Sequence, residues 1–304
     1  MRIVFFGTPH VAEIVLNYLI DHNIEIVGIV TRPDKPKGRS QKMQPPPVKS
    51  CAEKRLINVP IFQPTRASTP EFCEILKSLN ADLFVVVAYG EIIKQMLLDL
   101  PPKGCINVHF SQLPRWRGAA PMQHTLLHGD KETGVSIIEM VLALDAGAVL
   151  GEVKIPVPED MTCGELSSKL CEVSGPLLID VIKKIENNTI KPQPQDDAYV
   201  TLAPKITPEM CKIDWSRSAR DIHNQVRALS PHPGAWTMVE VQGHPKRLKI
   251  LRTRVSEAQP SYSKAGWFIQ TGQGVIEILE LQLEGKKPLS IKNFIAGILQ
   301  VSLL

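Results

Sequence analysis

The sequence has few aromatic residues and no long apolar run. Phe, Trp and Tyr make up 5% of its 304 residues. This low fraction argues against a protein that binds single-stranded nucleic acid mainly by stacking bases on aromatic rings. The longest notable apolar stretch, residues 83–88, is far shorter than the ~20 residues that a helix needs to cross a bilayer. The first residues also lack the apolar segment and small-residue cleavage site of a secretory leader, so we expect a cytoplasmic protein.

Several motifs that mark common enzyme classes are missing. No two of the six cysteines are spaced as Cys-x-x-Cys, which predicts reduced, mostly buried thiols rather than a zinc or redox site. Gly7 follows the first apolar run, but the other glycines of the dinucleotide-binding fingerprint are absent, and so are a P-loop lysine and a Gly-x-Ser-x-Gly elbow. Because no His, Cys, Asp and Glu residues have metal-ligand spacing, we expect no metal site.

The first half of the chain alternates continuous apolar runs with amphipathic stretches. This pattern predicts an α/β fold, a Rossmann-like doubly wound sheet that is mostly parallel, with its ligand crevice at the carboxyl ends of the strands. The expected strands are residues 2–6, 24–30, 83–88, 105–108 and 135–140, and the expected helices are residues 11–19 and 71–79.

The second half predicts a different architecture. Residues 163–185 read as a long helix, and residues 218–229 as another. Short alternating runs at 235–241, 247–254, 266–270 and 274–283 indicate a small β-barrel of the OB type. We therefore predict a catalytic domain at 1–188, a Pro- and Gln-rich linker at 189–206, and a C-terminal barrel domain at 207–304.

Positive charge is concentrated in the C-terminal third. Residues 205–304 hold 14 Lys and Arg against 8 Asp and Glu, a net +6, whereas the rest of the chain carries −2. This asymmetry favours a polyanionic partner, although a merely basic surface gives the same count. The candidate backbone contacts are Lys246, Arg247, Lys249, Arg252, Arg254, Lys286, Lys287 and Lys292.

A second basic segment, residues 32–55, interrupts the α/β pattern directly after a predicted strand. Only Asp34 and Glu53 oppose its cations, which include Lys35, Lys37, Arg39 and Lys42. We expect a long loop at the rim of the crevice, either gripping phosphates or forming a plain surface loop.

One polar constellation can carry chemistry. Asn107 and His109 stand two apart in a predicted strand, so alternation places both side chains on one face. An amide donor beside an imidazole can serve a developing oxyanion and move a proton, and Asp145 after the next strand could orient His109 or hold it protonated. Taken singly, an Asn-x-His is more often structural and an Asp-x-Gly is usually a turn.

A series of blocks in fixed order resembles the folate-dependent formyltransferases over nearly the whole chain. The resemblance is carried by Gly7-Thr8-Pro9, the basic insertion 33–39, residues 85–90, 107–121 and 144–147, and in the second half by 213–216, 227–229, 233–235 and 285–288. Several blocks in the right order are far more specific than any one of them.

This resemblance implies an activity and a set of site residues. It implies transfer of the formyl group of 10-formyltetrahydrofolate to the α-amine of initiator methionyl-tRNA, for translation initiation, without a metal. Asn107, His109 and Asp145 match the family's catalytic residues, and Arg39 matches an arginine that reaches the tRNA acceptor stem. Folate would contact Ser111, Gln112, Leu113, Pro114, Tyr89, Ile92 and Leu142. With Arg39, we expect Lys35, Lys37, Lys42, Arg247, Lys249 and Lys287 to bind tRNA, and we expect a monomer.

Several positions depart from the family pattern, and three of them lie close in sequence to the predicted catalytic residues. Phe110 replaces a small residue or proline, Gln112 a leucine, and Ala148 an aspartate. The alternatives are a formyltransferase acting on another amine, such as an amino sugar nucleotide, a hydrolase that releases formate, and a non-catalytic RNA-binding protein on the same scaffold.

Overall fold

The computed structural model describes residues 1–38, 41–297 and 301–304. Its contacts divide the chain into two compact units whose segments interleave along the sequence. The first unit comprises Met1–Arg117, Gly134–Ile155 and Ser168–Leu202, and the second comprises Gly118–Thr133, Pro156–Ser167 and Ala203–Leu304.

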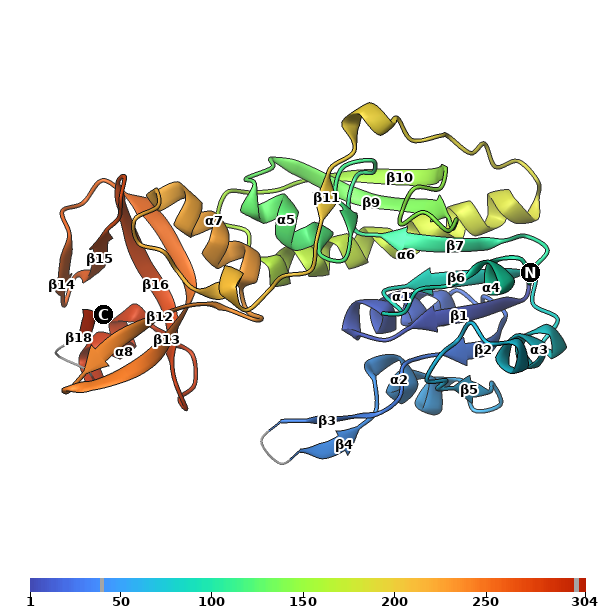
Figure 1. Ribbon diagram of the computed structural model, residues 1–304, viewed down its shortest axis with the longest axis horizontal. Helices are drawn as coiled ribbons and strands as arrows, with labels where there is room; N and C mark the ends of the chain where they lie inside the picture. The colour runs from blue at the N-terminus through green and yellow to red at the C-terminus, as the bar shows by residue number, and fades with distance from the viewer. Residues whose placement is uncertain (39–40, 298–300) are drawn as a thin grey trace. The chain divides into compact units, whose positions relative to one another are not determined.

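A seven-stranded sheet forms the centre of the first unit, in the order β10-β9-β7-β6-β1-β2-β5 (Figure 1). The pairs β1–β2, β1–β6, β2–β5 and β6–β7 are parallel, whereas β7–β9 is antiparallel. The strands are β1 (Ile3–Gly7), β2 (Ile26–Val30), β5 (Ile61–Phe62), β6 (Leu83–Val87), β7 (Cys105–His109), β9 (Glu132–Glu139) and β10 (Val149–Pro156).

Buried apolar side chains explain why these segments are strands between helices. Every residue of β1 and β6 is buried, as expected for parallel strands that are covered on both faces. At Gly7 a Cβ would lie 2.8 Å from the Cβ of Ala12, so the first strand and helix pack closely only with glycine there. The helices of this unit are α1 (His10–Asp21), α2 (Pro47–Arg55), α3 (Pro70–Ser78), α4 (Gln95–Leu98) and the part of α6 (Cys163–Glu186) from residue 168 onward.

The predicted mixed α/β fold with a mostly parallel sheet is confirmed, but the fifth apolar run differs in direction. β9 runs antiparallel to β7, with Glu139 opposite Ile106 and Ser136 opposite His109. The turn after β9 therefore starts beside the beginning of β7 rather than at its carboxyl end. A continuous apolar run gives no direction, because a strand buried on both faces looks the same either way.

The basic segment 32–55 is not a loop throughout, which corrects our expectation. It contains the antiparallel hairpin of β3 (Lys35–Lys37) and β4 (Lys42–Gln44), followed by helix α2. Pro47 occupies the first turn of α2, a position that suits proline because the N–H there has no helical partner.

The second unit contains a curled antiparallel sheet, a half-barrel, in the order β14-β15-β16-β13-β12-β18, with β17 paired to β16 (Figure 1). Its interior is apolar and includes Ile222, Val226, Ile250 and Ile278. The elements are β12 (Ala235–Val241), β13 (His244–Ser256), β14 (Ser261–Ser263), β15 (Gly266–Gln270), β16 (Val275–Leu283), β17 (Leu289–Ser290), β18 (Val301–Leu303), α5 (Pro121–Leu127), α7 (Ala219–Leu229) and α8 (Ile291–Gly297). Two further short strands, β8 (Arg117–Gly118) and β11 (Leu202–Ala203), pair with each other.

A buried arginine joins the separate segments of the second unit. The guanidinium of Arg227 on α7 donates to Asn224 Oδ1 at 2.9 Å, to the Pro158 carbonyl at 3.4 Å and to the Leu126 carbonyl at 3.4 Å. These bonds satisfy a buried polar group that would otherwise be costly, and they tie residues 118–133 and 156–167 to α7.

Candidate functional site

The polar residues at the end of β7 form the base of the candidate site. Asn107 is half-buried and His109 is buried, with 5% of its surface exposed. Their spacing in one strand gives both side chains the same face. Within the part of the chain that the structure describes, no hydrogen bond engages the Asn107 carboxamide, so its donor is available to a ligand.

His109 is held between a carbonyl and a carboxylate. Its Nε2 lies 2.9 Å from the Trp116 carbonyl oxygen and must donate to it, since a carbonyl only accepts. Its Nδ1 lies 3.7 Å from Oδ2 of Asp145, whose side chain is 11% exposed. The structure therefore brings together two of the residues that the sequence singled out, from segments far apart in the chain.

The electrostatics favour a neutral imidazole. Burial lowers the pKa of His109, while the Asp145 carboxylate and the Trp116 carbonyl act in the opposite direction. With Nε2–H engaged by Trp116, a neutral ring presents an unprotonated Nδ1 to Asp145. The pair can thus take up one proton between Nδ1 and the carboxylate, which is the property of a proton relay.

The turn that carries Asp145 has a demanding backbone. Asp145 has φ +50°, the left-handed region that most side chains avoid. A Cβ at Gly147 would lie 1.8 Å from the Glu139 carbonyl oxygen, so only glycine fits there. The side-chain amide of Gln195 donates to the carbonyl oxygens of both Asp145 and Gly147 at 2.8 Å.

The turn expected to contact folate is ordered by β9. Ser136 Oγ donates to the Ser111 carbonyl at 2.8 Å and accepts from Leu113 N at 3.1 Å. Ser111 and Leu113 are buried, while Gln112 and Pro114 are half-buried. Phe110, the departure nearest to His109, is also buried.

The other three residues expected to contact folate lie in different environments. Ile92 and Leu142 are 80% and 64% exposed and could contact a ligand only from an open surface. The Tyr89 ring is buried edge-on against Phe6, and burial, with the nearby Glu91 carboxylate, raises its pKa to about 12.

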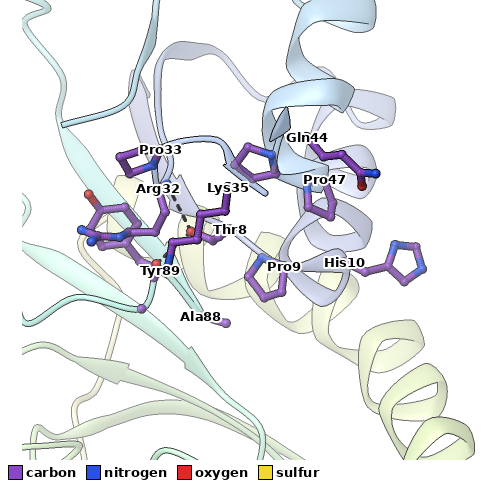
Figure 2. Close-up of a pocket in the computed structure, with 12 residues that line it drawn as sticks. Thr8, Pro9, His10, Arg32, Pro33, Lys35, Gln44, Pro47, Ala88 and Tyr89 are labelled. Atoms are coloured by element: carbon purple, nitrogen blue, oxygen red, sulfur yellow. Dashed lines mark hydrogen bonds between the residues drawn. The ribbon is translucent and has the colours of Figure 1, made fainter. Parts of the chain in front are cut away.

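A cavity of about 540 Å³ lies where β1, β2 and β6 end (Figure 2). Thr8 organises it, since its hydroxyl donates to the Tyr89 carbonyl at 2.8 Å and accepts from Arg32 N at 3.4 Å. Arg32 pairs with Glu91. The cavity wall combines prolines with cations and includes Pro9, Pro33, Pro46, Pro47, Arg32 and Lys35.

The cavity does not include the histidine–aspartate pair among its lining residues. The cavity and His109 lie at the same edge of the sheet, because β6 and β7 are parallel neighbours and their carboxyl ends share that edge. Lys35 and Gln44 of the β3–β4 hairpin line it, so the basic hairpin forms part of its wall.

The predicted tRNA contacts separate into different environments. Arg39 lies outside the described residues, and Lys37 is placed only as a member of β3. Lys35, Lys42 and Lys287 are exposed.

On the half-barrel, the Arg247 guanidinium stacks on the Trp236 ring at 4.2 Å, and Lys249 Nζ donates to the Pro233 carbonyl at 2.7 Å. Arg252 pairs with Glu165 and Glu280, and Arg254 with Glu277. The charges of these two arginines are therefore less available to a polyanion than the sequence suggested.

Among the described residues, no group of three or more His, Cys, Asp and Glu side chains could hold a metal ion. No described helix is both long and apolar enough to cross a membrane.

Comparison with known families decides which family the chain belongs to. The formyl transferase model matches residues 1–182, and the model of the formyl transferase C-terminal domain matches residues 205–299. The chain belongs to the formyl transferase family. This formyltransferase is therefore a one-carbon group transferase.

Curated relatives match over nearly their whole length. A methionyl-tRNA formyltransferase of Protochlamydia amoebophila is 45% identical, covering 98% of this chain and 95% of the relative. One of Citrifermentans bemidjiense is 40% identical, with 98% and 93% covered.

Solved structures share the fold at low identity. An N-formyltransferase from Helicobacter canadensis, in complex with folinic acid and dTDP-3-aminofucose, matches with a TM-score of 0.67 at 18% identity, covering 91% of this chain and 98% of that one. HypX from Aquifex aeolicus, in complex with tetrahydrofolic acid, matches with a TM-score of 0.67 at 16% identity over 97% of this formyltransferase. The chain spans about half of HypX, 47% of its length.

Sequence reasoning missed several residues that support the site. Ser136, Trp116 and Gln195 contribute a side-chain hydroxyl, a backbone carbonyl and a side-chain amide respectively. The contact of Trp116 is made by its backbone carbonyl, which every residue type has, so the sequence could not indicate it. Gln195 lies in a stretch that reads as a linker. Only Ser136 carried a signal, as a polar residue inside an apolar strand.

Proposed function

We propose that this formyltransferase transfers the formyl group of 10-formyltetrahydrofolate to the α-amine of initiator methionyl-tRNA, giving N-formylmethionyl-tRNA. The observation that carries the chemistry is the 3.7 Å approach of His109 Nδ1 to Asp145 Oδ2, beside the half-buried Asn107 on the same strand as His109. The acceptor is supported by relatives of 40–45% identity that are named for it.

The role of each side chain follows from whether it can donate or accept a hydrogen bond or a proton. When bound, 10-formyltetrahydrofolate supplies an activated formyl group. Asn107 Nδ2 donates to the formyl oxygen, which gains negative charge as the amine attacks. Removing one such donor typically costs about 10²–10³ in rate.

The proton balance assigns the role of His109 and Asp145. The new bond joins the amine nitrogen to the formyl carbon, and the bond to the folate N10 breaks. His109 Nδ1, with Asp145 beside it, takes the proton that the amine loses and returns it to N10. Burial keeps the ring neutral, and a neutral ring is ready to accept this proton. Burial therefore favours His109 as a base over the protonated His109 that the sequence also allowed.

The residues present suit a folate. The exposed aliphatic side chains of Ile92 and Leu142 offer contact to a flat ring. The turn with Ser111, Gln112, Leu113 and Pro114 offers the side-chain amide of Gln112, which is half-buried. Contacts of this kind would orient the co-substrate, which supplies much of the acceleration in a two-substrate transfer.

Two basic surfaces support an RNA acceptor. The first is the β3–β4 hairpin, which lines the 540 Å³ cavity and carries Lys35 and Lys42. The second is the half-barrel surface with Arg247, Lys249 and Lys287. In this proposal residues 1–188 catalyse, 189–206 connect, and 207–304 bind tRNA, in a monomer that acts in the cytoplasm.

Single-turnover transfer from labelled 10-formyltetrahydrofolate tests the proposal, with charged initiator tRNA and an amino sugar nucleotide as competing acceptors. We expect label on the tRNA alone, and Asn107→Ala and His109→Ala to slow transfer at least ~10²-fold while tRNA binding is retained. The matched control is His22→Ala, whose ring bonds the Tyr18 carbonyl on α1 and stacks on the Tyr18 ring, and we expect the parent rate. Label on the sugar would overturn the acceptor, and parent rates in both site variants would overturn the site.

A further inference from the structure

We infer that Gln195 is a positioning residue for the pair of His109 and Asp145, acting through the backbone of the turn that carries Asp145. The inference rests on the proposed function for the catalytic role of that pair. Gln195 lies in a stretch whose composition predicts a plain linker.

The contacts of Gln195 are directed at this turn. Its Nε2 donates to the carbonyl oxygens of Asp145 and Gly147, each at 2.8 Å. One carbonyl belongs to Asp145, which takes the left-handed conformation with φ +50°, and the other to Gly147 two residues later. A residue in such a conformation needs its surroundings to hold it there, and Gln195 supplies two bonds to that end.

Arg117 fixes which way the Gln195 amide points. Its Nε donates to Gln195 Oε1 at 2.9 Å, and because a guanidinium only donates, the oxygen must face Arg117. The nitrogen must then face the turn. Arg117 is held in turn by Asp197, 3.0 Å from its Nη2.

The same segment also holds the other partner of His109. We call residues 195–201 the site strap. Thr201 Oγ1 accepts from Trp116 N at 2.9 Å, and the Thr201 carbonyl accepts from Arg117 N at 2.9 Å. Since the Trp116 carbonyl accepts from His109 Nε2, the site strap binds the segments on both sides of the imidazole.

Burial singles out Gln195 within its surroundings. Gln195 is half-buried, whereas Pro194 and Asp196 beside it are exposed. Gln193 lies earlier in the same stretch and pairs with Val149 only through backbone groups, N to O at 2.8 and 2.9 Å, with its side chain exposed. The chain thus offers a matched glutamine whose side chain should not matter.

Two substitutions distinguish the role of the Gln195 hydrogen-bond donors from the role of its side-chain size. Gln195→Met keeps the length and removes every hydrogen bond. Gln195→Glu keeps the contact to Arg117 but turns an acceptor toward the two carbonyls. We expect both to lower kcat by about 10- to 100-fold, the cost of misplacing a reacting group by about 1 Å, with both KM values near those of the parent. Gln193→Met should leave kcat and KM unchanged.

A measurement that does not depend on catalysis completes the test. The Asp145 carboxylate is the charged group near His109 and favours its protonated form, so a displaced carboxylate should lower the pKa of His109. We expect NMR titration of the His109 ring to show a lower pKa in Gln195→Met than in the parent, the same direction as in Asp145→Asn. The variant that combines Gln195→Met with Asp145→Asn should be no slower than Asp145→Asn alone, since residues acting as one unit are not additive.

The outcomes distinguish the two proposals. An unmoved His109 pKa in a folded Gln195→Met variant, or additive losses in the combined variant, would overturn the positioning role. A lowered pKa in Gln195→Met together with full activity of Asp145→Asn would keep Gln195 as the residue that places Asp145 and would overturn the catalytic role of the pair.

Discussion

At the scale of single residues, two threonines near the ends of neighbouring strands differ in how their hydroxyls are satisfied. Thr8, after β1, bonds the Tyr89 carbonyl and Arg32 N and so shapes the cavity. Thr31, after β2, is fully buried, and its Oγ1 has no hydrogen-bond partner among the residues described. A buried hydroxyl without a partner lowers stability, whereas a bonded one contributes to it.

Substitution by valine tests this difference because the two side chains have nearly the same shape. We expect Thr31→Val to raise the free energy of unfolding by about 1 kcal/mol and Thr8→Val to lower it by about 1 kcal/mol. Urea denaturation followed by circular dichroism measures both. A loss of stability in Thr31→Val would mean that the hydroxyl has a partner that the contacts do not reveal.

At the scale of elements, the basic hairpin β3–β4 is anchored at its base. Asp34, just before β3, accepts from Gln63 Nε2 at 2.7 Å and from Lys49 Nζ of α2 at 3.0 Å. The hydrogen bonds from Gln63 and Lys49 lower the pKa of Asp34, so it is ionised at neutral pH. The anchor leaves Lys42 on β4 exposed, where it can meet a phosphate.

Salt dependence tests whether the hairpin grips RNA. Each phosphate contact adds about one to the slope of log affinity against log salt, because binding releases counterions. We expect Lys42→Ala to reduce the slope for charged tRNA by about one, measured by fluorescence anisotropy between roughly 50 and 200 mM salt. Lys77→Ala is the control, since this exposed lysine on α3 pairs with Glu74 and should leave the slope unchanged. An unchanged slope in Lys42→Ala would remove the hairpin from the RNA contacts.

At the scale of the whole molecule, buried histidines link stability to pH in both units. Burial lowers the pKa of His109 in the first unit and of His223 in the second. His223 is satisfied without a charge, by Thr253 Oγ1 at 3.0 Å and the Glu159 carbonyl at 3.1 Å. In the unfolded chain these rings have their ordinary pKa of about 6.5.

The sign of the effect follows from where protons bind. Below about pH 6.5 these two rings bind protons in the unfolded chain but stay neutral in the folded protein. Their contribution to stability is therefore complete above this pH and is lost as the pH falls toward the folded pKa values. Each ring contributes up to about 1.4 kcal/mol per pH unit within that window. We expect the urea midpoint to fall between pH 7.5 and 5.5 and to fall less steeply in His223→Gln. An equal slope in that variant would show that His223 is protonated in the folded protein.

The sequence by itself determined most elements of the fold and identified Asn107 and His109 at the end of β7. The apolar runs became β1, β2, β6, β7 and β9, because burial on both faces of a sheet leaves a local pattern that a short window reveals. Asn107 and His109 share a face for the same local reason. The family blocks supplied Asp145, which the structure brings to 3.7 Å from His109.

Only the tertiary structure decided how that carboxylate reaches the imidazole and what holds it there. β9 is antiparallel, so the end of that strand lies away from the carboxyl end of β7, and the turn beyond it folds back to bring Asp145 to His109. Burial keeps the ring neutral, and a backbone carbonyl fixes which of its nitrogens carries the proton. The turn depends on Gln195, which comes from a stretch without periodicity. Such contacts join residues far apart in the chain, and strand direction and register, which no local pattern encodes, determine which of them meet.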